Sequence, residues 1–283
     1  MPAFFVLLWA TGFIVARLVA SHAEPFTFLA VRVTLTSVVF AAVSAVTGAR
    51  WPDGARGWAN ALLAGMLLQG VYLGGVFWST RHGLPAALAA LIGGLQPLLT
   101  AALAPLLLGE RVSQRRWAGI VLGSIGTFLV LLPKLGASDV PGIAVLAAFA
   151  GTAGITFGTI WQKRTAATVD LRTNAAVQFL GASMLLAPLA LLTETGQFDA
   201  TWPVWLGLAW SVLGLSVGAI SLLLLLIRRG AVAGVASLFY LTPPVTAAMA
   251  FLLFGEALTA MQIAGMAIAA FGVALASRPE RTG

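Results

Sequence analysis

The sequence predicts an all-α membrane protein of ten transmembrane helices, arranged as two inverted five-helix repeats. Hydrophobic residues make up 60% of the 283 residues and charged residues only 9%, whereas a soluble domain carries about a quarter of its residues as charges. The apolar stretches are about 20 residues long, which is the length of helix that crosses a hydrocarbon core of ~30 Å. Because these runs do not alternate as the strands of a membrane barrel do, a helical bundle is predicted.

The spans are predicted in order from the apolar runs and the short polar breaks between them. The first, 2–20, has no basic segment before it and no cleavage site after it, so we expect a retained helix and not a signal peptide. The next four are predicted at 27–47, 57–80, 86–107 and 113–132. The last five are predicted at 141–161, 173–192, 202–226, 232–253 and 259–277.

The basic residues concentrate in alternate breaks. With a cytoplasmic N-terminus, twelve of them face the cytoplasm and three face outward, namely Arg17, Arg81 and Lys134. Short loops rich in Lys and Arg stay in the cytoplasm, so we expect both termini on the cytoplasmic side of a bacterial inner membrane. The net charge of +7 then follows from topology, and no nucleic-acid partner is expected.

The last five spans repeat the first five at an offset of 146 residues. The strongest matches are a proline, a glutamate and spaced glycines, in which Pro97, Gly109-Glu110, Gly119 and Gly126 correspond to Pro243, Gly255-Glu256, Gly265 and Gly272. We therefore divide the chain into repeats at 1–133 and 141–283. Because five is an odd number of helices, the second repeat enters the membrane from the opposite side, which is the arrangement of many carriers.

These residues resemble the drug/metabolite transporter superfamily, and in particular its ten-helix permeases of the EamA type. The resemblance rests on the P-x12-E pattern of each half, on the G-x6-G helix that follows it, and on Ala30-Val31-Arg32 in the second span. Within the superfamily the chain is similar to bacterial exporters of aromatic amino acids. Carriers of sugar phosphates and nucleotide sugars share the fold, so the resemblance implies a carrier but does not identify its solute.

Prolines interrupt the fourth and ninth spans at matching positions. Pro97 and the pair Pro243-Pro244 lack the backbone N–H that a helix needs, which frees carbonyl groups such as that of Gly93. Interrupted helices at matching positions of two repeats indicate a binding site near the midplane. The alternative is a packing kink, which is common in membrane helices.

Polar and aromatic side chains within the spans give the candidate solute-binding residues, because polar groups there are costly unless they face a partner or a wet cavity. Four of them fall near one stripe of the third span, two adjoin the prolines, and three are rings that suit a cavity wall: Gln69, Tyr72, Ser79, His82, Gln96, Thr242, Trp9, Trp161 and Tyr240. Hydrogen bonds between helices, or packing against lipid, are the alternative roles for each.

Arg32 is the one basic residue predicted well inside the bilayer, and its counterpart in the second half is the neutral Gln178. It either anchors a solute carboxylate or is held by a loop acid or by backbone carbonyls. All nine acidic residues map to breaks or span ends. Since proton-coupled carriers usually place a carboxylate at mid-membrane, we expect a facilitator, with His82 as the remaining titrating group.

The predicted function is export of amino acids, aromatic or hydrophobic ones and related metabolites, by alternating access. The alternative carrier is a proton-coupled exporter of hydrophobic drugs or organic cations, and the non-carrier alternative is a membrane enzyme or a structural scaffold. No catalytic motif or metal-binding pattern occurs and no cysteine is present, so no catalytic residue, metal or cofactor is expected. The expected partners are a small-molecule substrate and the bilayer; a monomer suffices and a dimer is compatible.

Overall fold

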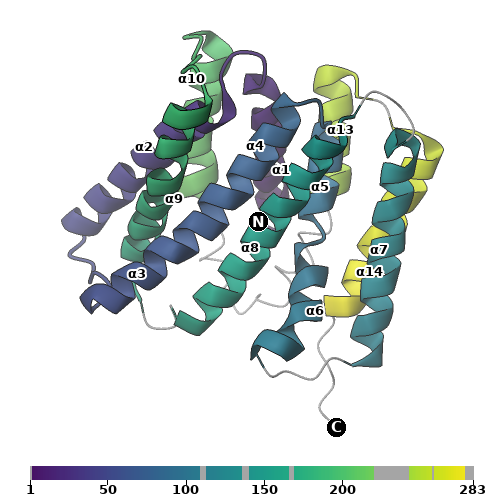
Figure 1. The fold of residues 1–283 in the computed structure, drawn as a ribbon, viewed down its shortest axis with the longest axis horizontal. Helices are drawn as coiled ribbons and strands as arrows, with labels where there is room; N and C mark the ends of the chain where they lie inside the picture. The colour runs from purple at the N-terminus through teal and green to yellow at the C-terminus, as the bar shows by residue number, and fades with distance from the viewer. Residues whose placement is uncertain are drawn as a thin grey trace.

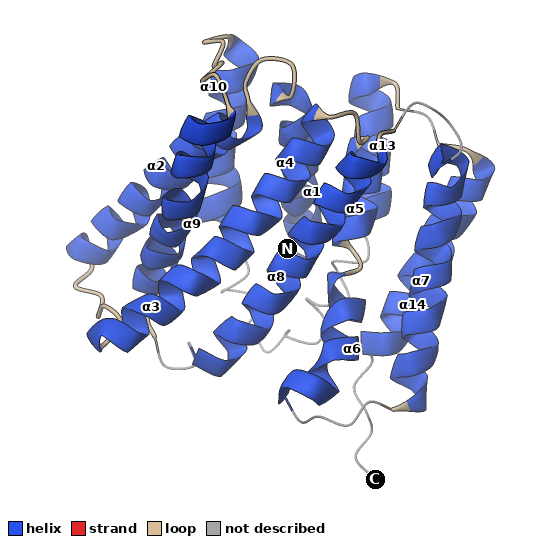
Figure 2. Ribbon diagram, in the orientation of Figure 1, coloured by secondary structure: helices blue, strands red, loops and turns tan. Residues whose placement is uncertain are grey.

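The structure, a computed structural model, describes residues 2–108, 113–135, 140–165, 169–219, 242–256 and 258–277. Every regular element in those ranges is a helix, and the one strand-like contact is an isolated bridge between Ala23 and Phe198 (Figure 2). The prediction of an all-helical chain is therefore confirmed.

The helices follow the predicted spans in order. Seven spans hold a single described helix: α1 (Pro2–Val19), α2 (Pro25–Val46), α7 (Gln114–Leu135), α8 (Gly142–Thr165), α9 (Leu171–Thr193), α13 (Thr242–Phe254) and α14 (Ala260–Ser277). Three are composite: α3 (Gly54–Gly65) with η1 (Met66–Val71) and α4 (Tyr72–Arg81), α5 (Ala86–Gly93) with α6 (Gln96–Leu108), and α10 (Trp202–Ala209) with η2 (Trp210–Ala219).

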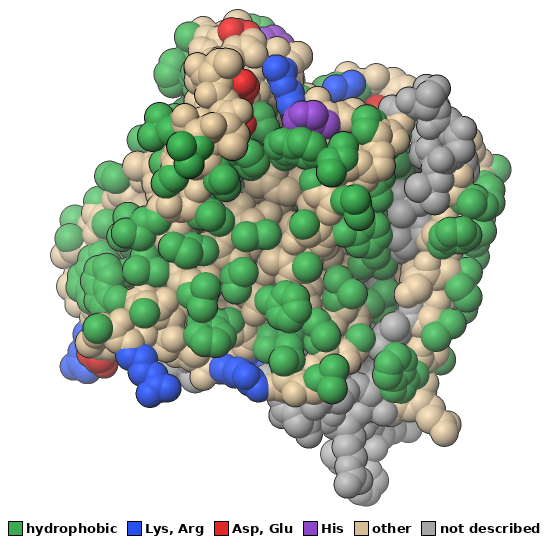
Figure 3. Space-filling model, viewed as in Figure 1, with side chains coloured by type: hydrophobic (Ala, Val, Ile, Leu, Met, Phe, Trp, Pro, Cys, Tyr) green, Lys and Arg blue, Asp and Glu red, His purple; other side chains and the backbone are tan. Residues whose placement is uncertain are grey.

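The outside of the bundle is apolar. Four helices are long and apolar enough to cross a membrane, namely Pro25–Val46, Gly54–Arg81, Gly142–Thr165 and Leu171–Thr193, and six further described stretches are apolar but shorter. Figure 3 shows a broad band of hydrophobic side chains, with charged residues gathered at its two ends. Large exposed apolar patches mark surfaces that meet another apolar phase, and here that phase is lipid.

The packing of the helices follows the internal repeat. At one side of the molecule α7 lies along α14, and at the other α2 lies along α9 (Figure 1). The glycines of the first pair explain its closeness. A β-carbon at Gly126 would stand 2.6 Å from the carbonyl oxygen of Gly265, and one at Gly272 would stand 2.7 Å from that of Gly119. The two contacts exchange repeat-equivalent positions, as a twofold relation between the halves requires.

Two wide helical turns break the regular α-geometry of the third and eighth spans. η1 and η2 are π-helices, and at the offset of 146 residues η1 maps onto positions inside η2. Such segments are rare and often lie at functional sites. Uniform helices were predicted here, because apolar periodicity alone does not distinguish an α-turn from a π-turn.

The fourth span is also not one helix. α5 ends at Gly93 and α6 begins at Gln96, with the break at Gly94 and Leu95. Pro97 therefore lies in the first turn of α6, where a proline is tolerated because the missing N–H would have no helical partner. The predicted interruption beside Pro97 is present, and it separates two helices where a single helix over 86–107 was expected.

Candidate substrate site

The break between α5 and α6 is held by neighbouring helices at about mid-depth. The carbonyl oxygen of Ile92 accepts hydrogen bonds from the N–H of Leu95 at 3.1 Å and from the hydroxyl of Thr152, on α8, at 3.2 Å. At Gly93 a β-carbon would stand 3.4 Å from the ring of Phe13 and 3.6 Å from the hydroxyl oxygen of Tyr72. Helices α1, α4, α5 and α8 thus meet at the break.

The first turn of α13, from the other repeat, completes this region. A β-carbon at Gly94 would stand 3.2 Å from Cγ of Pro243, so the break of the fourth span lies against the proline pair that is predicted to interrupt the ninth. The residues directly before Thr242 lie outside the described range. Thr242 and Thr246 are buried beside Pro243, and their hydroxyl groups have no hydrogen-bond partner in the described chain. Unpartnered hydroxyl groups in a buried layer are available to a polar ligand.

The other predicted residues at this level are placed as follows. Gln96 donates a hydrogen bond of 3.4 Å from its amide to Thr159 on α8. Trp9 and Gln69 are half-buried on α1 and η1, and the indole nitrogen of Trp161, further along α8, is buried without a partner among the described residues. Tyr240 lies outside the described residues, and for Pro97 and Pro244 only the backbone is described.

The predicted stripe of the third span divides into an inner and an outer part. Tyr72 is buried at the break, whereas the hydroxyl of the buried Ser79 donates to the carbonyl of Val76 in its own helix. His82 is exposed at the end of α4 and stacks on Trp78 at 3.7 Å between ring centroids. The prediction grouped these residues by their spacing alone. However, η1 precedes Tyr72, and its π-turns rotate Tyr72 about the helix axis relative to Gln69.

Arg32 is buried on α2, with 5% of its surface exposed. Its guanidinium carbon lies 5.9 Å from the ring centre of Phe77, and neither Nε nor Nη1 has a hydrogen-bond partner in the described chain. The predicted alternative of a loop acid or backbone carbonyl holding these two atoms is therefore not found in the described residues.

The outer ends of several helices are joined by polar contacts. Glu256, just after α13, accepts hydrogen bonds from Arg17 on α1 at 3.2 Å and from the N–H of Ala86 on α5 at 3.1 Å. Arg81 donates to the carbonyl of Ala20 and to the side chain of Gln197. Glu256 was predicted only as a repeat-matched loop residue, and no signal in the sequence indicates that it bridges three spans.

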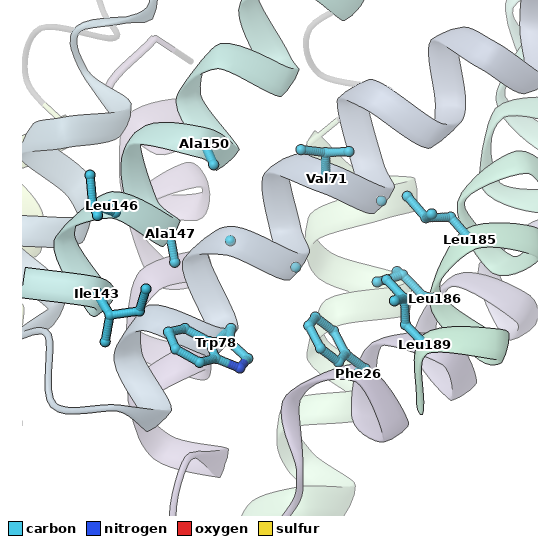
Figure 4. Close-up of a pocket in the computed structure, with 13 residues that line it drawn as sticks. Phe26, Val71, Trp78, Ile143, Leu146, Ala147, Ala150, Leu185, Leu186 and Leu189 are labelled. Carbon is cyan, nitrogen blue, oxygen red and sulfur yellow. The ribbon is translucent and has the colours of Figure 1, made fainter. Parts of the chain in front are cut away.

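A groove of about 550 Å³ lies elsewhere, between α4, α8 and α9 (Figure 4). Gly70, Gly74 and Gly75 line it on one helix, and side chains such as Leu146 and Leu185 form its walls. Leu146 is exposed on the lipid side, and none of the predicted solute-binding residues lines the groove. The groove is lined almost entirely by apolar groups and lies apart from the break between α5 and α6.

Known proteins resemble the chain along its whole length. A probable amino-acid metabolite efflux pump of Salmonella typhimurium is 27% identical, covering 95% of this chain and 90% of the relative. A probable terminal-alkyne amino-acid exporter of Streptantibioticus cattleyicolor is also 27% identical, covering 96% and 91%. The inner membrane transporter YedA of Escherichia coli is 26% identical over 95% and 87%.

A solved structure described only as a crystal structure of a protein has the same fold. It superimposes with a TM-score of 0.69 at 22% identity, covering 97% of this chain and 95% of the other. The model of the EamA-like transporter family matches twice, at residues 3–132 and 142–278. With a match in each half and ten helical spans, the chain belongs to the EamA-like transporter family of membrane proteins.

Proposed function

We propose that this protein exports amino acids, chiefly aromatic and hydrophobic ones and closely related metabolites, across a bacterial inner membrane by alternating access. The observation that carries the proposal is a contact between the two repeats, where Pro243 of α13 lies against the break at Gly94. The interrupted fourth span of the first repeat and the start of α13 from the second repeat then border the same region, and interrupted segments mark the solute site of repeat transporters. The names of two relatives, an amino-acid metabolite efflux pump and an amino-acid exporter, support this class of solute.

The surroundings suit a small amphipathic solute. Phe13 and Tyr72 contribute rings at the break, while Thr152, Thr242 and Thr246 contribute hydroxyl groups. Apolar walls with a few fixed polar groups are typical of small-molecule sites. An amino acid with an aromatic or aliphatic side chain matches both parts of this lining.

We also infer a facilitator. Within the described chain, the carboxylates nearest the bundle lie at helix ends: Glu194 and Glu256 bind the first turns of α2 and α5. A proton-coupled exporter of organic cations usually needs a carboxylate at mid-membrane. Efflux driven by the solute gradient, with cytoplasmic termini, therefore accords best with the positions of the charges.

Counterflow in proteoliposomes tests the proposal. Vesicles loaded with phenylalanine are expected to take up labelled phenylalanine with no ion gradient, whereas vesicles loaded with tetraphenylphosphonium are expected to exchange it no faster than protein-free vesicles, which this lipophilic cation also crosses. Gly94→Val should slow exchange by about tenfold, because the added side chain meets Pro243 and overpacking costs about 1–3 kcal/mol. Gly142→Val is the matched control, since a β-carbon at Gly142 meets nothing within 4 Å.

Three results would contradict the proposal. Exchange of the cation without the amino acid would establish the drug exporter. Uphill accumulation driven by a pH step and abolished by His82→Ala would establish proton coupling. Because the chain contains no cysteine, Asp53→Cys and Thr195→Cys also report topology, and labelling of both from one side by an impermeant thiol reagent would overturn the inverted repeat.

A further inference from the structure

Arg32 is a buried charge without a compensating acid in the described chain. It lies on the buried stripe of α2 with Phe28, Leu29, Val33 and Thr36. One face of the Phe77 ring meets its guanidinium group, and Phe77 also stacks on Phe28 at 5.6 Å between ring centroids. A ring offers only a weak attraction to a cation, and a buried charge left unpaired is costly.

The carboxylates near the same end of the bundle have other partners. Glu256 binds Arg17, Glu194 binds the N–H groups of Phe26 and Thr27, and Glu24 binds the N–H of Gln197. At the opposite end Asp170 pairs with Arg172. Asp53 precedes α3, and Asp199 lies in the loop with Gln197. None of these described acids hydrogen-bonds the guanidinium group of Arg32.

Arg32 faces α4, the helix that also carries Tyr72, because its guanidinium carbon lies over the ring of Phe77, five residues after Tyr72. Tyr72 in turn reaches the helix break, because its hydroxyl oxygen lies beside Gly93. The unpaired cation thus meets the helix whose first residue, Tyr72, lies at the candidate substrate site.

We propose that Arg32 is the carboxylate anchor of this carrier, and that the hydroxyl of Tyr72 is a second donor to the same carboxylate. The inference rests on the proposed function, because the transported amino acid supplies the anion. A guanidinium group presents a planar fork of N–H donors that matches a carboxylate. The bound solute would satisfy Nε and Nη1, which have no partner in the described protein.

The second repeat has no such anchor. The residue equivalent to Arg32 is Gln178, which is also buried, at 6% exposure, and whose amide nitrogen also lacks a partner in the described chain. The residue equivalent to Tyr72 is Gly218. One anionic group therefore binds toward the first repeat, and the solute's side chain is left to face the second.

Binding of three probes to the purified protein in nanodiscs tests the anchor: phenylalanine, its amide, and 3-phenylpropanoate, which keeps the carboxylate and lacks the amine. A hydrogen-bonded charge pair is worth about 1.5–3 kcal/mol, so wild type should prefer phenylalanine over the amide by about 10- to 100-fold. Arg32→Gln should reduce that preference to about twofold, Arg32→Lys should retain part of it, and Gln178→Leu, the matched control, should retain all of it.

The melting temperature without ligand is a second readout. If the charge of Arg32 is unpaired in the ligand-free protein, Arg32→Gln removes an uncompensated charge, and the melting temperature should stay the same or rise. A fall in melting temperature, together with an unchanged preference for the acid, would show that Arg32 is structural and would overturn the proposal.

The outcomes separate this inference from the proposed function. If phenylalanine is exchanged and Arg32→Gln keeps the preference for the acid, the anchor is wrong and the exporter stands. If phenylalanine is not exchanged but 3-phenylpropanoate binds in an Arg32-dependent way, the exporter is wrong and the anchor stands. If wild type binds no carboxylate more tightly than its amide, the anchor is wrong whatever is transported.

Discussion

The two repeats agree where helices pack and differ where the solute is proposed to bind. Gly126 and Gly272 make equivalent close contacts, each with the facing helix of the other repeat. η1 and η2 are π-helices at equivalent positions. Gln178 and Gly218, by contrast, replace Arg32 and Tyr72. The retained positions thus maintain contacts related by a twofold axis, as alternating access of the proposed carrier requires, while the altered positions make the two halves of the proposed site chemically different.

The largest expected effect comes from breaking the matched glycine contact. Gly126→Val and Gly272→Val should each destabilise the protein by about 2–3 kcal/mol, because each added side chain meets the backbone of the facing helix. The two losses should be similar, since the contacts are equivalent. Thermal unfolding in detergent measures them, with the unobstructed Gly142→Val as control. A large loss at only one of the two positions would show that the pair is not symmetric.

A smaller effect is expected at the helix break. Thr152→Val removes the hydroxyl that binds the carbonyl of Ile92, whereas Thr156→Val removes a hydroxyl that bonds only to its own helix, at the carbonyl of Thr152. Both residues are buried on α8. We expect Thr152→Val to cost about 1 kcal/mol more than Thr156→Val and to slow counterflow. Equal losses would mean that α8 does not support the break.

The sequence predicted the ten spans because bilayer thickness sets their length and apolar composition marks them. It also predicted the interruption beside Pro97, since a missing N–H can be read from the residue type. The contact of Gly94 with Pro243 and the hydroxyl of Thr152 on Ile92 could not be predicted. Both are made between spans far apart in the chain, and neither residue type is unusual in a membrane helix.

Residue spacing did not predict how the stripe of the third span divides between the helix break and the outer end. Ser79 and His82 share the periodicity of Tyr72, yet Ser79 bonds to its own helix and His82 is exposed at the outer end. Periodicity predicts which side of a helix a residue faces, but it does not predict how deep in the bundle the residue lies. The predicted side is also wrong beyond a π-turn such as η1, because a π-turn contains more residues than an α-turn. For Arg32 the sequence left two roles open, and the positions of the surrounding acids are the observation on which the proposed anchor rests.

Of the two repeat-matched glutamates only Glu256 is described, because Glu110 lies outside the described residues. The contacts at the end of the second repeat can therefore be tested through Glu256. A double-mutant cycle of Arg17→Ala and Glu256→Ala should give a coupling of about 0.5 kcal/mol, since the side chain of Arg17 is 44% exposed. Glu256→Ala alone should cost more than Arg17→Ala, because it also leaves the N–H of Ala86 unpaired. Equal single losses would show that Glu256 does not cap α5.

The smallest effect concerns Glu24 and Asp170, the repeat-equivalent residues that precede α2 and α9. Partial desolvation raises the pKa of Glu24, but hydrogen bonds from the 195–197 loop outweigh it, and the pKa lies below its usual value. The hydrogen bond from the Arg172 side chain lowers the pKa of Asp170. A lowered pKa means that each carboxylate stabilises the fold above its unfolded pKa, near 4, and that this contribution is lost as the pH falls through the folded value.

The melting temperature should therefore fall between about pH 5 and pH 3, and Glu24→Gln or Asp170→Asn should each reduce that fall. Asp170→Asn should have the larger effect, because Asp170 bonds both the N–H of Arg172 and its guanidinium group, whereas the side chain of Glu24 does not cap its own helix. Asp53→Asn is the matched control, since Asp53 precedes α3 without a capping hydrogen bond. An Asp53 variant that reduces the fall as much as the Asp170 variant would show that general charge, and not these two helix ends, governs the acid response.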